Sequence, residues 1–209
     1  HIIADMYRKS VSKYEIANDN AKNLGTGTHI DLAVVPTGVA REDWKKLDIT
    51  AEDVFNCFSL GIGPDMIAGY PLVSVYLSGR EFKNACEIDC SMGNTLGVSL
   101  LRLFFSGITY EYNPHRLVLD KVTHVYLVKE DGTKEEVQDD KLYRVVSDIY
   151  TGKMLASVND LTKGLLSLIP KNSDGSVIEN LEDNIIRVNL FEGTTEFKAW
   201  AAIAEGVKM

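Results

Sequence analysis

Apolar side chains near the start of the chain recur at spacings of three and four residues. This spacing is followed by Ile3, Tyr7, Val11 and Tyr14, and Lys, Arg and Glu occupy positions between them. An α-helix brings residues three and four apart onto one face. The pattern therefore predicts an amphipathic helix in the opening segment, over about residues 1–14.

Short runs of β-branched and aromatic residues follow along most of the chain, bounded by turn residues, and such runs are typical of strands. They cover residues 29–35, 71–77, 101–105, 108–112, 122–128, 134–137, 143–149 and 185–190. Asp131-Gly132 separates two of these runs. Asp-Gly in that position is a hairpin signal, because both central residues of the turn can adopt positive φ.

Helix starts are signalled by residues that can cap a free backbone N–H. Thr50 to Asp53 and Ser78 to Glu81 each read as a capping box, with a hydroxyl residue followed three positions later by an acid. Near the end of the chain, Thr194 or Thr195 is expected to cap a last helix. The apolar face of that helix would carry Phe197, Trp200, Ala201 and Ala204.

Helices and strands are interspersed without a regular βαβ rhythm, which favours an α+β domain with mixed sheets flanked by helices. The 209 residues are 45% hydrophobic and 25% charged, as in ordinary globular proteins. No repeat, low-complexity tract or linker divides them. We therefore expect a single domain over residues 1–209.

The net charge of −8 argues against a general nucleic-acid binder, which needs a concentrated Lys/Arg surface. It leaves room for a small phosphorylated ligand, which needs only one or two cations. The longest apolar run, residues 98–105, is interrupted by Ser99 and Arg102. It is far shorter than the roughly 20 residues of a membrane helix, so no membrane span is expected.

The usual signatures of catalysis are missing from the sequence. None of the four histidines stands in an HxH, HExxH or Cys/His pattern, so we expect no metal site and no catalytic residue here. The glycines of Gly61-Ile62-Gly63 lack the third glycine of a dinucleotide loop. Cys57, Cys86 and Cys90 are read as small buried hydrophobic residues. An enzyme using Cys86 or Cys90 stays as an alternative that requires a depressed thiol pKa.

Two segments of the sequence are candidate ligand-binding sites, because each directly follows a predicted strand and ligands often bind at strand ends. The loop Pro36 to Arg41 leaves the first strand, and Arg41 could grip a phosphate or a ribose. Tyr150 follows the strand at residues 143–149, and an aromatic ring there could stack on a nucleobase. The alternatives are a solvated arginine and a tyrosine that covers the core.

Six segments in register resemble one known family over residues 1 to about 156. They are residues 1–8, 29–41, 49–55, 75–87, 105–114 and 141–147, the first reading HIIADMYR and the last KLYRVVS. This pattern is similar to the C-terminal domain of 5'-nucleotidases and UDP-sugar hydrolases, which also occurs in 2',3'-cyclic-nucleotide phosphodiesterases.

The resemblance implies a division of labour between two domains. In that family an N-terminal metallophosphoesterase domain holds two divalent metal ions, and the C-terminal domain supplies base-stacking aromatics and ribose or phosphate contacts. It implies no cofactor in this chain, with the metal ions and the N-terminal domain elsewhere in the parent protein. It further implies nucleotide catabolism and an extracellular, periplasmic or cell-wall-attached location.

Only some of the family's substrate-binding residues are kept in this sequence. The family's Asn-Gly-Gly-Gly-Ile-Arg loop falls on Pro36 to Arg41, which keeps the arginine, and its second stacking aromatic falls on Tyr150. The resemblance thus implies substrate contacts at Arg41 and Tyr150, with Thr37 and Gly38 beside them. The first stacking aromatic falls near residues 59–62 and a ligand-binding aspartate on residues 155–158, and neither side chain is kept.

Two functions follow from these observations. The first is the substrate-binding domain of a metal-dependent 5'-nucleotidase-type hydrolase, which binds a nucleotide or a related small phosphoester. On its own this chain is expected to be inactive, because nothing in it would lower the pKa of water. The alternative is a non-catalytic ligand-binding or interaction module with a diverged pocket.

Overall fold

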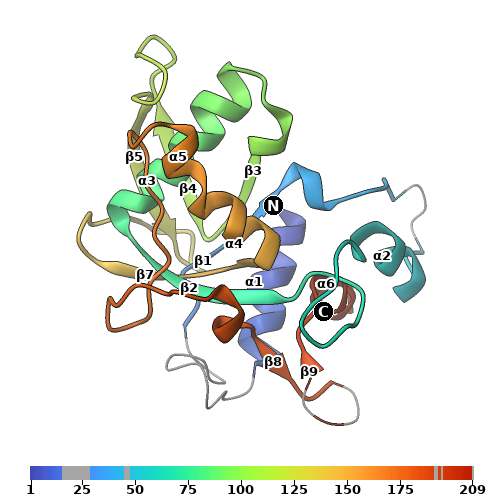
Figure 1. Ribbon diagram of the computed structural model, residues 1–209. Helices are drawn as coiled ribbons and strands as arrows, with labels where there is room; N and C mark the ends of the chain where they lie inside the picture. Colours follow the sequence, from blue (N-terminus) through green and yellow to red (C-terminus); the bar gives the residue numbers. More distant parts are fainter. Residues whose placement is uncertain (16–28, 45–47, 191–192, 194, 209) are drawn as a thin grey trace.

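The computed structural model describes residues 1–15, 29–44, 48–190, 193 and 195–208 (Figure 1). A four-stranded sheet forms its centre, in the order β2-β7-β1-β3. The parallel pair is β1 with β7, and the other two pairs are antiparallel. The strands span Leu32–Pro36 (β1), Leu72–Ser78 (β2), Leu103–Ser106 (β3) and Leu142–Asp148 (β7).

Two smaller antiparallel sheets flank the central one. The first joins β4 (Ile108–Tyr112), β5 (Val122–Val128) and β6 (Lys134–Glu136), and the second joins β8 (Arg187–Val188) and β9 (Thr195–Glu196). The α-helices are α1 (Ile2–Tyr14), α2 (Ala51–Phe58), α3 (Gly79–Glu87), α4 (Ile149–Ala156), α5 (Val158–Leu161) and α6 (Ala199–Val207). Other helical turns are η1 (Thr37–Val39), η2 (Ile88–Thr95, π-helical), η3 (Ser99–Leu101) and η4 (Leu181–Asn184).

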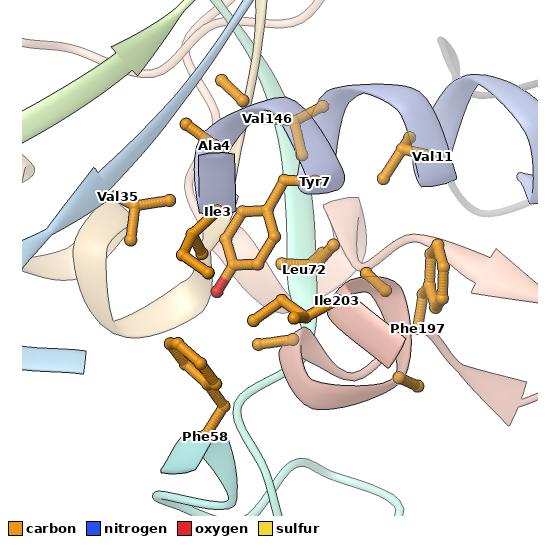
Figure 2. Packing of buried hydrophobic residues seen from close by; sticks show 14 of the residues in the cluster. Ile3, Ala4, Tyr7, Val11, Val35, Phe58, Leu72, Val146, Phe197 and Ile203 are labelled. Atoms are coloured by element: carbon orange, nitrogen blue, oxygen red, sulfur yellow. The ribbon is translucent and has the colours of Figure 1, made fainter. Parts of the chain in front are cut away.

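The central sheet is covered on both faces. Along β1, Ala33 and Val35 point into a cluster with α1, α2 and α6, whereas Leu32 and Val34 point into a second cluster with α3. Successive side chains of a strand face opposite sides, so every residue of β1 is buried. Figure 2 shows the first cluster, in which the ring of Tyr7 lies among side chains from the sheet and from α6.

Helices α1 and α6, from opposite ends of the sequence, pack together. Ser10 Oγ donates a hydrogen bond to the carbonyl of Ala202 at 2.6 Å. A Cβ at Gly206 would lie 2.6 Å from Met6 Cβ, so the two helices approach closely because this residue has no side chain. The helix predicted at the start of the chain is confirmed, and its apolar face is completed by α6.

Local signals in the sequence are largely confirmed. Both capping boxes form, at Thr50 with Asp53 and at Ser78 with Glu81. The Asp-Gly hairpin joins β5 to β6, closed by a hydrogen bond from Lys129 N to the carbonyl of Thr133. Among the described non-glycine residues, those at positive φ are Met66, Leu119 and Lys163, so in this turn Gly132 alone adopts it. The α+β class with mixed sheets is also confirmed.

The end of the chain departs from the prediction. The last helix begins at Ala199 with Lys198 as its N-cap, and Thr195 lies in β9, so the expected cap at Thr195 is wrong. Thr194 lies outside the described residues. The strand expected over residues 185–190 shortens to Arg187–Val188, because its only ladder partner within the described residues, β9, is two residues long.

Candidate functional site

The carboxyl ends of the two parallel strands define one edge of the central sheet. Leu32 pairs with Val145 and Ala33 with Val146 in parallel, so β1 and β7 run in the same direction; β1 is followed by η1, which begins at Thr37, and β7 by α4, which carries Tyr150 in its first turn. Ligands of sheets with parallel strands often bind outside the carboxyl ends. The topology therefore brings Thr37 and Gly38 to the same edge as Tyr150.

The loop after β1 is tied to the neighbouring strand. Thr37 donates to the carbonyl of Arg102 from its backbone N–H at 3.0 Å and from its hydroxyl at 3.3 Å. Val39 is buried, and the backbone N–H of Arg41 donates to the carbonyl of Cys57 at 3.1 Å. This loop is consequently anchored at both ends, with Thr37 exposed and Gly38 half-buried between the anchors.

Arg41 is exposed and lies beyond the sheet edge, where the loop approaches α2. It lines a hollow of about 560 Å³ together with Glu42, Asp43, Trp44, Ile49, Asp53 and Asn56. Tyr150 is not among the residues that line this hollow. The three carboxyl groups beside Arg41 make the hollow a poor match for an anion.

Tyr150 is presented by the first turn of α4. Its neighbour Asp148 caps that helix, accepting hydrogen bonds from the backbone N–H of Thr151 at 2.9 Å and from its hydroxyl at 2.5 Å. Burial raises the pKa of Asp148, and the hydrogen bonds from Thr151 offset only part of this effect. The buried cap fixes the turn, while the side chain of Tyr150 stays 39% exposed.

Sequence reasoning does not reach Tyr70, which stacks on Tyr150. The ring centroids are 5.5 Å apart and the ring planes differ by 20°. The antiparallel register of β2 with β7, continued beyond Leu72 opposite Asp148, puts Tyr70 beside Tyr150.

The spacing of the two tyrosine rings leaves no room for a ligand ring between them. A third ring there would need about 7 Å between the tyrosine rings, two stacking contacts of about 3.5 Å each. One face of Tyr150 is thus taken by Tyr70, and a ligand ring would use the other. Without the strand order, no signal in the sequence joins these tyrosines.

The loop where the family has its other aromatic carries no ring between Ser59 and Ile62. Gly61 lies against Tyr70 instead, and a Cβ there would be 2.2 Å from Tyr70 Cε1. Further along, Lys198 Nζ contacts Asp65 Oδ1 at 2.6 Å and Glu196 Oε2 at 2.7 Å. Burial would raise the pKa of Asp65, but its bonds to Lys198 and to the Ile67 backbone outweigh this and lower it. These contacts hold the loop that carries Gly61 and Asp65 in place next to Tyr70.

The cysteines have the environment of core residues. All three are free and buried, as expected from the sequence. Burial raises the pKa of the Cys86 thiol well above its usual value and also raises that of Cys90. A nucleophilic cysteine needs the opposite shift, so Cys86 and Cys90 lack the depressed pKa that the alternative of a thiol enzyme requires.

Within the part of the chain that the structure describes, no three or more His, Cys, Asp and Glu side chains gather in a way that could hold a metal ion. None of the helices found there is both long and apolar enough to cross a membrane.

Three solved structures share the fold. The 5'-nucleotidase precursor from Thermus thermophilus is 17% identical, with a TM-score of 0.61 over 99% of this chain and 31% of its own. The NAD nucleotidase of Haemophilus influenzae is 16% identical, with a TM-score of 0.55 over 99% of this chain and 29% of its own. A putative 5'-nucleotidase from Staphylococcus aureus, in complex with alpha-ketoglutarate, is 12% identical, with a TM-score of 0.51 over 86% and 30%.

The present chain thus spans about 30% of the length of each of these proteins. No curated protein matches it in sequence. A family model described as the 5'-nucleotidase, C-terminal domain matches residues 2–156, which include β1, β7 and the residues at their carboxyl ends. On this match over most of its length, the chain belongs to the 5'-nucleotidase C-terminal domain family.

Proposed function

We propose that this chain is the substrate-recognition domain of a metal-dependent 5'-nucleotidase-type phosphoesterase that acts on nucleotides or related phosphoesters. The observation that carries the proposal is the parallel pairing of β1 with β7, whose carboxyl ends lead to Thr37 and Gly38 on one strand and to the partly exposed Tyr150 on the other. Membership of the family supports it. The role that follows is to hold and orient the substrate.

The chemistry of hydrolysis would come from outside this chain. Residues 1–209 would form one domain, joined in the parent protein to an N-terminal metallophosphoesterase domain with its divalent ions. Such ions generate a hydroxide by lowering the pKa of bound water. We expect the chain alone to bind ligand without hydrolysing it. The parent protein would then work in nucleotide catabolism, in an extracellular, periplasmic or cell-wall-attached location.

The geometry suggests how a nucleotide would lie. Its base would stack on the face of Tyr150 that Tyr70 leaves open, an interaction that contributes about 1–3 kcal/mol in comparable sites. Its ribose would run along Thr37, which is exposed, and Gly38, which is half-buried. Arg41 would approach from the far end of the same loop.

Titration of the purified chain with AMP, adenosine and UDP-glucose, by calorimetry or NMR, tests this function. Tyr150→Ala should weaken nucleoside binding by about tenfold to a hundredfold, since it removes the stacking surface. Tyr112→Ala is the matched control, because Tyr112 is also exposed but lies on β4 of another sheet. If the parent chain binds none of the three at millimolar concentration, or if both variants bind alike, the nucleoside site is refuted.

One observation favours the second candidate, a non-catalytic interaction module. The loop before β2 exposes Ile62, Met66 and Ile67 to 63%, 79% and 49%. Exposed apolar side chains in a group are typical of contact surfaces. This module would keep its partner when Tyr150 is changed and lose it when Met66→Asp is introduced, which is the reverse of the result expected for a nucleotide site.

A further inference from the structure

A second hollow lies at the amino ends of the parallel strands, at the opposite edge of the central sheet from Thr37. Its volume is about 550 Å³, and its walls come from α1, from the segments that lead into β1 and β7, from the β3–β4 turn and from the hairpin of β5 with β6. A smaller hollow of about 300 Å³ lies along α1 and shares Arg8, His29 and Glu130 with it. The five residues of β1, with a rise of about 3.3 Å each, separate both hollows from Thr37 by roughly 17 Å.

Arg8 projects from α1 into both hollows and is held there by backbone contacts. Its Nε donates to the carbonyl of Ile30 at 3.1 Å. A Cβ at Gly107 would lie 2.8 Å from Arg8 Nη1 and 2.2 Å from the carbonyl oxygen of Asp31, and Gly107 has a φ of +90°. A glycine satisfies both this backbone conformation and the lack of space. The guanidinium therefore has a fixed place beside the β3–β4 turn.

The terminal nitrogens of Arg8 are available to a ligand. The bond to Ile30 uses one of the five N–H donors that a guanidinium carries. Within the residues that the structure describes, Nη1 and Nη2 donate to no protein acceptor and form no ion pair. A planar pair of N–H donors of this kind matches two oxygens of a carboxylate or a phosphate group.

Three of the four acids that line the two hollows already have partners. Glu135 pairs with Lys129 at 2.9 Å. Asp31 accepts from a backbone N–H of β7 at 2.7 Å, and Asp5 accepts from the hydroxyl of the serine that ends β3. The fourth acid, Glu130, is exposed and has no such partner within the described residues. The acids therefore leave most of the positive charge of the hollows without neutralisation.

Three lysines add to the positive charge of Arg8. Lys9, Lys13 and Lys141 line the hollows and form no ion pair with a described residue. Lys13 and Lys141 each hold Nζ over a nearby tyrosine ring, 4.8 and 5.2 Å from its centre. Four cations thus stand beside one acid without a partner, in a chain whose net charge is −8. A concave surface with an excess of one charge concentrates ions of the opposite charge.

We propose that the hollow around Arg8 binds a small oxyanion with two or more negative charges, as carried by pyrophosphate or by a di- or tricarboxylate. The terminal nitrogens of Arg8 hold one charged group of this ligand, and the surrounding lysines neutralise the other. The site is separate from the proposed nucleotide site and does not depend on it. Because the ligand touches both α1 and the β5–β6 hairpin, its binding stabilises the folded chain.

Calorimetric titrations with pyrophosphate and with citrate test this site, at a constant ionic strength set with sodium chloride. The parent chain is compared with Arg8→Met and Arg116→Met. Arg116 is the control, because it is exposed and pairs with Asp120 in the loop between β4 and β5, at the other end of these strands. Arg8→Met should weaken anion binding by about tenfold to a hundredfold, and Arg116→Met should leave it unchanged.

Lys141→Met is a second variant, which alters an exposed side chain and decides the question if Arg8→Met does not fold. It should weaken anion binding by about threefold to tenfold. Tighter binding of pyrophosphate would identify a phosphate ligand, and tighter binding of citrate a carboxylate. If the parent chain binds neither anion, if both hollow variants bind as the parent does, or if Arg116→Met loses as much affinity as they do, the site is refuted.

Discussion

Two arginines of this chain, Arg144 and Arg102, are each held by a buried carboxylate, and they differ in what the rest of the guanidinium does. Arg144 lies in β7 with 1% of its side chain exposed. Its Nη2 contacts Glu15 Oε1 at 2.5 Å and its Nε donates to Ser74 Oγ at 2.8 Å. Arg102 gives only Nε to Asp89 and keeps 39% of its side chain exposed.

The difference separates a fully buried arginine, whose donors are used within the fold, from one whose side chain stays partly exposed. Removing one member of a buried ion pair leaves a charge without compensation in a medium of low polarity. Removing the partly exposed Arg102 should cost less, because Asp89 would keep its hydrogen bonds from the backbone N–H of Leu103 and from the hydroxyl of Tyr110. Burial of the side chain, and not the ion pair itself, therefore sets how much stability the arginine contributes.

The largest loss of stability is expected when Arg144 is replaced. Replacing it in Arg144→Met should lower the free energy of unfolding by about 3–5 kcal/mol, since Glu15 would lose this ion pair while it stays buried. Arg102→Met should cost about 1 kcal/mol or less. Urea denaturation of both variants and the parent chain measures the difference. Equal losses for the two substitutions would remove the distinction between these arginines.

A third pair, Glu81 with Lys171, lies between the two extremes, with side-chain exposures of 9% and 20%. Burial would raise the pKa of Glu81, but hydrogen bonds from Lys171 and from the backbone of Ser78 and Ile169 outweigh it and lower the pKa. The ionised form therefore stabilises the fold above the unfolded pKa of about 4.3, and this contribution is lost as pH falls through the lowered value.

Glu81→Gln should accordingly lower the free energy of unfolding at pH 7 by about 1–2 kcal/mol. The parent chain should lose stability between about pH 5 and pH 3, and the variant should lose less over the same interval. Urea denaturation at several pH values gives both curves. Parallel curves for parent and variant would show that Glu81 does not contribute to the acid sensitivity.

The smallest effect on the free energy of unfolding is expected for a substitution at Tyr7. Its hydroxyl is a buried polar group that, unlike the ion pairs above, is not hydrogen-bonded within the described residues. Burial, with a smaller effect from Asp148, raises its pKa well above the usual value. Tyr7→Phe removes this unpaired oxygen and should change the free energy of unfolding by no more than about 1 kcal/mol, toward greater stability. A clear loss of stability on thermal or urea denaturation would reveal a partner for this hydroxyl.

The sequence predicts best what is local. The capping boxes at Thr50 and Ser78 join residues three positions apart, and the Asp131-Gly132 turn joins consecutive strands. The buried pair of Glu15 and Arg144, in contrast, spans 129 positions. The order of strands in a sheet cannot be predicted from local patterns in a single sequence. Contacts between residues far apart in the chain are therefore seen only in the folded structure.

The residues of the candidate site also fall into those that the sequence predicts and those that only the fold reveals. Gly38, Arg41 and Tyr150 can be proposed from the sequence because they follow strands and match a family pattern, and Thr37 can be proposed because it lies in the same loop. Arg102, whose carbonyl accepts hydrogen bonds from Thr37, cannot be found in this way, because it interrupts an apolar run and resembles an ordinary strand residue, and its partner Asp89 stands 13 positions earlier in an unpredicted π-helical segment. Tyr70 escapes sequence reasoning because only the pairing of β2 with β7 brings it to Tyr150.

The packing of α1 against α6 has a consequence for biosynthesis. Ser10 and the carbonyl to which it donates are 192 positions apart, and the residues between them must be synthesised before the two can meet. At about 5–20 residues per second, the apolar face of α1 would wait roughly 10–40 seconds for its partner helix. During that interval the face is open to chaperones and to other nascent chains.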